Sequence, residues 1–169
     1  MKKEPEWSDA AEIYQLYRAG ITTRDMAVRF NRSQSMIMVK KRSAQGEAKR
    51  RLGAVYEQMV LLRLKDQGFL AERLGGESEP DILAEKDGKK YVIACKIYED
   101  AKATVTMPVS EIKPELFYAK AQGAELLVYF YNMAWNAEIV KTVNVQEPPE
   151  RITFSRQELL AAPLALSRT

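Results

Sequence analysis

The chain has 169 residues, a single cysteine, no histidine and a formal net charge of +3. One cysteine excludes an internal disulfide, and without histidine neither a Cys-His zinc finger nor a Ser-His-Asp triad can form. Any catalysis must therefore use carboxylates, lysine and a hard cation.

No apolar run approaches the roughly 18 residues of a membrane span. The charged start, residues 1–6, differs from an apolar signal segment. We therefore expect a cytoplasmic protein, or one that acts on cellular DNA, with no membrane partner.

The charge is unevenly distributed along the chain. Residues 1–52 hold 12 Lys and Arg against 6 Asp and Glu, whereas the remaining residues hold 14 against 17. A positive first third is typical of a segment that binds a phosphate backbone, although a solvated basic helix would have the same composition.

The first third predicts three helices. Apolar residues at helical spacing indicate a helix over 9–17, which ends at Gly20. Thr22 or Thr23 can cap a second helix over 24–30, with Met26, Ala27 and Phe30 facing inward, and Ser33 can cap a third that runs to about Ala44.

The segment 20–33 resembles the helix-turn-helix modules of recombinases and sigma-factor-like regulators. In such a module the third helix enters the major groove of DNA, and the basic residues after it contact phosphates. The alternative is a plain three-helix bundle that binds protein. The residues expected to contact DNA are Arg32, Gln34, Ser35, Lys40, Lys41, Arg42, Lys49, Arg50 and Arg51.

The remaining two thirds predicts a domain that contains both helices and strands. A helix over 52–67 is followed by three strands, a helix, two further strands and a short last helix that begins at a capping box, Ser155 to Glu158. The predicted strands are 69–74, 80–85, 89–98, 124–133 and 138–145, with a helix over 110–121 between the third and the fourth. This order predicts an α/β sheet with helices packed on it.

The most informative motif is Pro80-Asp81 followed, after an Asp87-Gly88 turn, by a β-rich run that ends in Lys96. A two-residue Asp-Gly connection predicts a tight hairpin, so Asp81 and Lys96 should lie on neighbouring strands. A carboxylate and an ammonium placed in this way can hold a divalent cation beside an attacking water.

These residues resemble the PD-(D/E)XK, or restriction-endonuclease-like, nuclease superfamily, and most of all the archaeal Holliday-junction resolvases. The resemblance spans about 45 residues, from 53 to 96, and is carried by segments 53–57, 68–69, 75–82 and 93–96. It implies a restriction-endonuclease-like mixed sheet flanked by helices, preceded here by a small all-α helix-turn-helix module. The expected divisions are 1–45, a basic linker 46–52, and a nuclease-like domain 53–169.

The resemblance also implies roles for particular residues. Asp81 would be the principal ligand of Mg²⁺ or Mn²⁺, beside the backbone carbonyl of Cys95. Lys96 would orient the attacking water or stabilise the developing charge, and Glu57 would assist the metal or its water. Junction cleavage would require a homodimer with paired sites.

One position departs from the family's pattern, because Ala94 stands where its second metal-binding acid belongs. The acid can have migrated to the next helix, where Glu111 and Glu115 lie, as in some restriction enzymes. Alternatively, the domain is a catalytically silent DNA-binding protein, or alanine was introduced to inactivate a nuclease. Glu57, Asp81 and Glu111 also have purely structural interpretations, Glu111 as an acid near a helix N-terminus.

Overall fold

The computed structural model describes residues 7–74, 76 and 79–161. It contains two compact units, Met1–Leu52 and Gly53–Thr169. Within the first, α1 spans Trp7–Arg18 and α2 spans Thr23–Arg29.

Gly20, Thr22 and Ser33 lie at the turns between the first helices, as the sequence predicts. Gly20 follows α1 with a φ of +85°, and Asn31 follows α2 with a φ of +48°. Thr22 caps α2, because its Oγ1 accepts a hydrogen bond of 3.2 Å from the N–H of Asp25. The backbone N–H of Met36 is similarly bonded to Ser33 Oγ at 3.3 Å, at the start of the third helix.

The first unit has a small core. Of its described side chains, three in the hydrophobic cluster are completely buried, one from each of α1, α2 and the third helix: Ile13, Met26 and Ile37. Ala27 and Phe30 pack against them in partly buried positions, so the predicted inward face of α2 is confirmed.

The third and fourth predicted helices are one helix, α3, over Gln34–Asp66. The prediction that the third helix ends near Ala44 is wrong, and residues 46–52 are helical. Gly46, the only residue there with poor helix propensity, costs about 1 kcal/mol. Glu47 offsets part of this cost by pairing with Arg50 and Arg51, three and four residues on. Among the described residues no helix is both long and apolar enough to cross a membrane.

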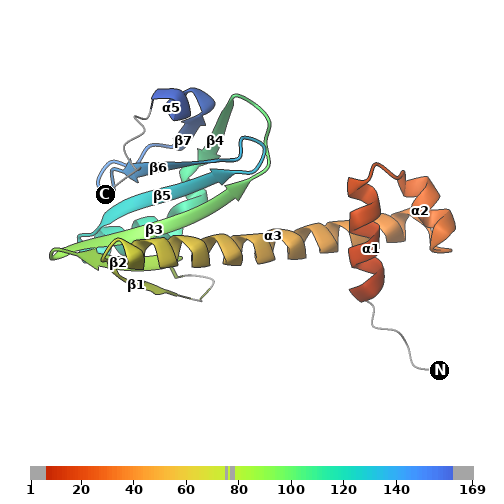
Figure 1. Cartoon of the computed structure of the whole chain (residues 1–169), viewed down its shortest axis with the longest axis horizontal. Coiled ribbons are helices and arrows are strands. Elements are labelled where there is room, and N and C mark those ends of the chain that lie inside the picture. The colour runs from red at the N-terminus through yellow and green to blue at the C-terminus, as the bar shows by residue number, and fades with distance from the viewer. Residues whose placement is uncertain (1–6, 75, 77–78, 162–169) are drawn as a thin grey trace. The chain divides into compact units, whose positions relative to one another are not determined.

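The second unit is built on a mixed five-stranded sheet (Figure 1). Its order is β1-β2-β3-β5-β6, and only the β3–β5 pair is parallel. The strands are β1 (Leu70–Arg73), β2 (Ile82–Lys86), β3 (Lys89–Tyr98), β5 (Glu125–Asn132) and β6 (Ala137–Val143). The predicted α/β class is confirmed.

The hairpin between β2 and β3 sets the register of the candidate site. Asp87 and Gly88 both have positive φ, +53° and +76°, as a type I′ turn requires. Ile82 therefore pairs with Ile93. The β1–β2 ladder aligns Arg73 with Ile82, and Leu74 donates a hydrogen bond to the Asp81 carbonyl at 3.1 Å. The neighbouring residues 75, 77 and 78, part of the predicted motif, lie outside the described residues.

Different elements cover the two faces of the sheet. Alternation along β3 places Ile93 and Cys95 in one cluster, with the C-terminal part of α3, and Val92 and Ala94 in the other. Lys96 lies on the same face of β3 as Val92 and Ala94, because side chains alternate along a strand. The second face is covered by α4 (Lys113–Gln122), which follows the 3₁₀ turn η1 (Val109–Ile112).

Two short strands were not predicted. β4 (Thr104–Pro108) and β7 (Arg151–Ser155) form a separate antiparallel pair that packs Met107 and Phe154 into the core. The last helix, α5 (Arg156–Ala161), follows β7. Its predicted capping box is confirmed, since the N–H of Ser155 donates to Glu158 Oε1 at 3.0 Å.

Candidate active site

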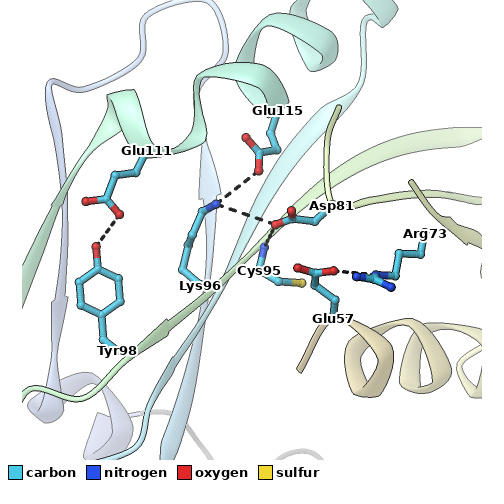
Figure 2. A network of polar contacts seen from close by, with 8 residues as sticks. All are labelled: Glu57, Arg73, Asp81, Cys95, Lys96, Tyr98, Glu111 and Glu115. Atoms are coloured by element: carbon cyan, nitrogen blue, oxygen red, sulfur yellow. Dashed lines mark hydrogen bonds and ion pairs between the residues drawn. The ribbon is translucent and has the colours of Figure 1, made fainter. Parts of the chain in front are cut away.

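Asp81 and β3 meet as the hairpin predicts (Figure 2). Asp81 immediately precedes β2, and its Oδ2 accepts a hydrogen bond of 2.7 Å from the backbone N–H of Cys95. Lys96 Nζ lies 3.9 Å from the same oxygen. One carboxylate oxygen of Asp81 is thus bonded to β3, and this bond orients the carboxylate beside the ammonium.

Glu115 completes a row of three charged groups. It comes from the first turn of α4, its side chain is only 4% exposed, and its Oε1 lies 3.5 Å from Lys96 Nζ. Lys96 therefore lies between two carboxylates, Asp81 and Glu115, as Figure 2 shows. The other oxygen, Glu115 Oε2, is buried and has no hydrogen-bond partner among the described residues.

Burial dominates the electrostatics of this cluster. It raises the pKa of Glu115, an effect opposed by the positive charge of Lys96 and reinforced by Asp81. Burial also raises the pKa of the Cys95 thiol, and the negative charge of Asp81 raises it further. Cys95 is therefore a protonated core side chain at neutral pH and a poor nucleophile.

Glu57, on α3, lies near Asp81 and Cys95 in Figure 2 but is paired with Arg73. Its Oε2 accepts a hydrogen bond of 2.6 Å from Arg73 Nε, on β1. The predicted assisting acid is therefore not joined to Asp81 by any contact in the structure. Arg73 was not predicted as a site residue. Its position near the end of a predicted strand next to the Asp81 loop was the only available signal.

Glu111 lies apart from Lys96. It belongs to η1, and Tyr98 Oη donates a hydrogen bond of 2.7 Å to its Oε2. Of the two acids considered as replacements for the one missing at Ala94, the structure brings Glu115 to Lys96 and leaves Glu111 with Tyr98.

Ala94 is completely buried in an apolar cluster, opposite Val128 of β5. It shares a face of β3 with Lys96, two residues later, because side chains alternate along a strand. The position expected to carry the second acid thus points toward the side of the sheet that α4 covers, but it contributes no oxygen.

The donor atoms present fit a hard cation. Mg²⁺ usually retains several waters and binds through one or two carboxylates. Asp81 and Glu115 flank Lys96, and the partnerless Glu115 Oε2 is an oxygen whose burial is otherwise unexplained. Across the described part of the chain, no three Asp, Glu, Cys or His side chains gather closely enough to hold an ion by themselves.

The residues predicted to contact bases lie at the start of α3. Arg32, Gln34 and Ser35 are exposed, and Ser35 Oγ lies 3.0 Å from Ser33 Oγ. These side chains are available to a ligand in the first unit.

The predicted phosphate-binding residues are unequally available. Arg42 and Lys49 are exposed, whereas Lys40 is half-buried. Lys41 Nζ lies 3.2 Å from the centre of the Tyr17 ring, a close cation–π contact.

Arg50 and Arg51 already have an acidic partner in α3. Both form ion pairs of 2.9 Å with Glu47. The hydrogen bonds from the two arginines lower the pKa of the Glu47 carboxyl, and the bond from Arg51 has the larger effect. These arginines are nevertheless exposed, so the pairs are weak surface interactions.

The architecture of the second unit, a mixed sheet flanked by helices, is consistent with the restriction-endonuclease-like fold. The chain is similar to a solved structure of Hjc, a Holliday junction resolvase from the archaeal hyperthermophile Archaeoglobus fulgidus. The two share 21% sequence identity with a TM-score of 0.47, over 62% of this chain and 84% of that one. No protein-family model matches the chain, and neither does any curated protein.

Proposed function

We propose that this protein is a DNA-binding, Mg²⁺-dependent endonuclease that hydrolyses phosphodiester bonds, with branched or junction DNA among its substrates. The observation that carries the proposal is the convergence of Asp81, Cys95 and Lys96 across the β2–β3 hairpin, with 2.7 Å and 3.9 Å contacts to one Asp81 oxygen. The sequence motif and the geometry agree at these residues.

Asp81 would be the principal ligand of Mg²⁺ or Mn²⁺, with the Cys95 backbone carbonyl beside it. The hydrogen bond from Cys95 N–H holds the carboxylate in place before any ligand arrives, so little reorganisation is required. A bound cation would supply Lewis-acid stabilisation of the phosphate charge and lower the pKa of a coordinated water. Glu57 would assist after exchanging its partner Arg73.

Lys96 would act on the attacking water or on the phosphate. Its side chain is about one-fifth exposed, and its ammonium lies between Asp81 and Glu115. From there it can donate a hydrogen bond to the water, which orients it, or to a phosphate oxygen as negative charge develops.

The first unit would bind DNA as a helix-turn-helix. Arg32, Gln34 and Ser35 would reach base edges, and the basic residues that follow on α3 would contact phosphates. The exposure of all three residues supports this role. A homodimer would place two sites on one branched substrate.

A second candidate function is supported by Ala94, which is completely buried and provides no carboxylate. In this alternative the protein is a catalytically silent, nuclease-fold DNA-binding protein. The two candidates predict the same DNA affinity and differ in metal binding and cleavage.

Cleavage of linear, flapped and four-way DNA with Mg²⁺ or Mn²⁺ tests the proposal. We expect metal-dependent cleavage by the parent chain and none by Asp81→Asn. Asp87→Asn is a matched control, because it makes the same change in the β2–β3 turn and Asn tolerates a positive φ. Absence of cleavage on every substrate, with DNA binding retained in chelator, would favour the silent protein.

A further inference from the structure

The most unusual polar group in the described residues is Glu115 Oε2. It is the one buried side-chain oxygen or nitrogen there that lacks a hydrogen-bond partner. Burying a carboxylate oxygen without a partner is unfavourable, and most such atoms in native proteins are satisfied or serve a function. Lys96 compensates only Glu115 Oε1, at 3.5 Å.

The charges around Glu115 favour a cation. Asp81, Lys96 and Glu115 together carry a net charge of −1 when ionised, so the lysine leaves one negative charge uncompensated. The three groups are mostly buried, with side-chain exposures of 21%, 21% and 4%. A divalent cation is attracted strongly to such a cluster, because water screens the charges of buried groups poorly.

The fold also supplies a reason for Glu115 to lie there. An acid at position 94 would project from the face of β3 that carries Lys96, toward the side covered by α4. Glu115 approaches Lys96 from α4 itself. The two positions can therefore serve the same site from opposite layers, and a small residue at 94 is compatible with an acid on the helix.

We propose that Glu115 is the second carboxylate of the divalent-cation site, in the role that an acid at position 94 would otherwise have. The inference rests on the proposed function and specifies it further: the Ala94 chain has a complete pair of acids, Asp81 and Glu115, for Mg²⁺ or Mn²⁺.

Binding of Mn²⁺ to the full chain, measured by calorimetry without DNA, tests this assignment. We expect Glu115→Gln to weaken binding at least about tenfold, since a direct ligand should matter no less than the groups that support ligands. Glu138→Gln is the matched control, because Glu138 is also a poorly exposed acid paired with a basic residue, Arg63. It should bind Mn²⁺ as the parent does.

A variant that moves the acid from position 115 to position 94 tests whether Glu115 is a metal ligand or only a structural partner of Lys96. Ala94→Glu combined with Glu115→Gln returns the acid to the strand and should recover most of the lost Mn²⁺ affinity. If Glu115→Gln does not fold by circular dichroism, Glu115→Asp keeps the charge but withdraws its oxygens by one methylene. It should then weaken Mn²⁺ binding relative to the parent.

The outcomes distinguish this inference from the proposed function. If Asp81→Asn loses Mn²⁺ while Glu115→Gln, or the folded Glu115→Asp, binds as the parent does, the nuclease proposal stands and the assignment of Glu115 is wrong. Loss of binding in Glu111→Gln instead would transfer the role to Glu111. If the parent chain itself does not bind Mn²⁺, both proposals fail.

Discussion

Lys96 is the cation that pairs with Glu115 in the part of the chain that the structure describes. Its removal would leave a buried carboxylate without this compensating charge, a change that is strongly destabilising in protein interiors. Lys96 therefore has a structural role in addition to the proposed catalytic one.

Lys96→Met should lower the free energy of unfolding in a pH-dependent manner. Burial already raises the pKa of Glu115, and loss of the lysine charge raises it further. A carboxyl group whose pKa is raised on folding lowers the free energy of unfolding at pH values above that pKa. The variant should therefore be less stable than the parent by about 1–3 kcal/mol at pH 8, and this difference should shrink as the pH falls toward the ordinary carboxyl pKa. Urea unfolding in chelator at pH 8 and pH 5 measures both, and an equal deficit at the two pH values would contradict this role of the lysine.

At the residue scale, the sequence was a good guide to short-range geometry and a poor one to long-range packing. The convergence of Asp81 and Lys96 follows from a two-residue turn and the alternation of strands. By contrast, the choice between Glu111 and Glu115 depends on where η1 ends and α4 begins. The Glu57–Arg73 pair depends on the register of β1, which no local pattern determined.

At the level of elements, the β2–β3 hairpin is the part of the fold that most directly positions the site. Its two turn residues both have positive φ, which Gly88 adopts without strain and other residues adopt with difficulty. The energetics of this turn should therefore be sensitive to a single added methyl group.

Gly88→Ala should destabilise the protein by about 1 kcal/mol, because alanine is strained at a φ of +76°. Gly53→Ala is the opposite control: it lies within α3, and a Cβ added there meets nothing within 4 Å. That change should stabilise by about 0.5–1 kcal/mol. Thermal and urea unfolding of the two variants would show the sign reversal, and equal effects would refute it.

The elements themselves were predicted unevenly. β3 was predicted with its observed bounds, Lys89–Tyr98, since a long β-rich run after an Asp-Gly turn leaves little ambiguity. β4 and β7 were missed because each has only two buried apolar residues, and their pairing across more than 40 residues leaves no local signal. The break predicted within α3 failed because ion pairs support helix around Gly46.

The basic residues of α3 should control DNA binding. Replacing Lys40, Lys41 and Arg42 with alanine should reduce affinity and lower the slope of log K against log salt, by about 0.9 for each phosphate that is no longer neutralised. Arg50→Ala with Arg51→Ala should have a smaller effect per residue, because Glu47 already pairs with both. Fluorescence anisotropy over a salt series measures these slopes. An unchanged slope in the triple variant would indicate a protein-binding module.

At the scale of the whole molecule, the two units differ in how much core they have. Among the residues that the structure describes, the first unit buries three hydrophobic side chains in its cluster, whereas the second has one cluster of fifteen buried residues and another of eight. Burial of apolar surface is the main source of folding free energy, so the first unit should be much the less stable.

Hydrogen exchange of the intact protein should resolve this difference. Amides of α1 and α2 should exchange through openings of lower free energy than those of β3 and β5, with a gap of several kcal/mol. Ile152→Val, in the core of the second unit, should reduce protection of the sheet and leave that of α1 and α2 unchanged. Uniform protection across both units would show that they unfold together.

If the first unit binds DNA as proposed, the small core seen in its described residues also has a thermodynamic consequence. A ligand that binds only the folded form adds RT ln(1 + [L]/Kd), or about 2.7 kcal/mol at a concentration 100 times Kd. Because the described core of this unit has only three buried side chains, an addition of this size should be a large part of the unit's total stability. Bound DNA would then stabilise the folded form of this unit, and the folded population of α1 and α2 would rise with the DNA concentration.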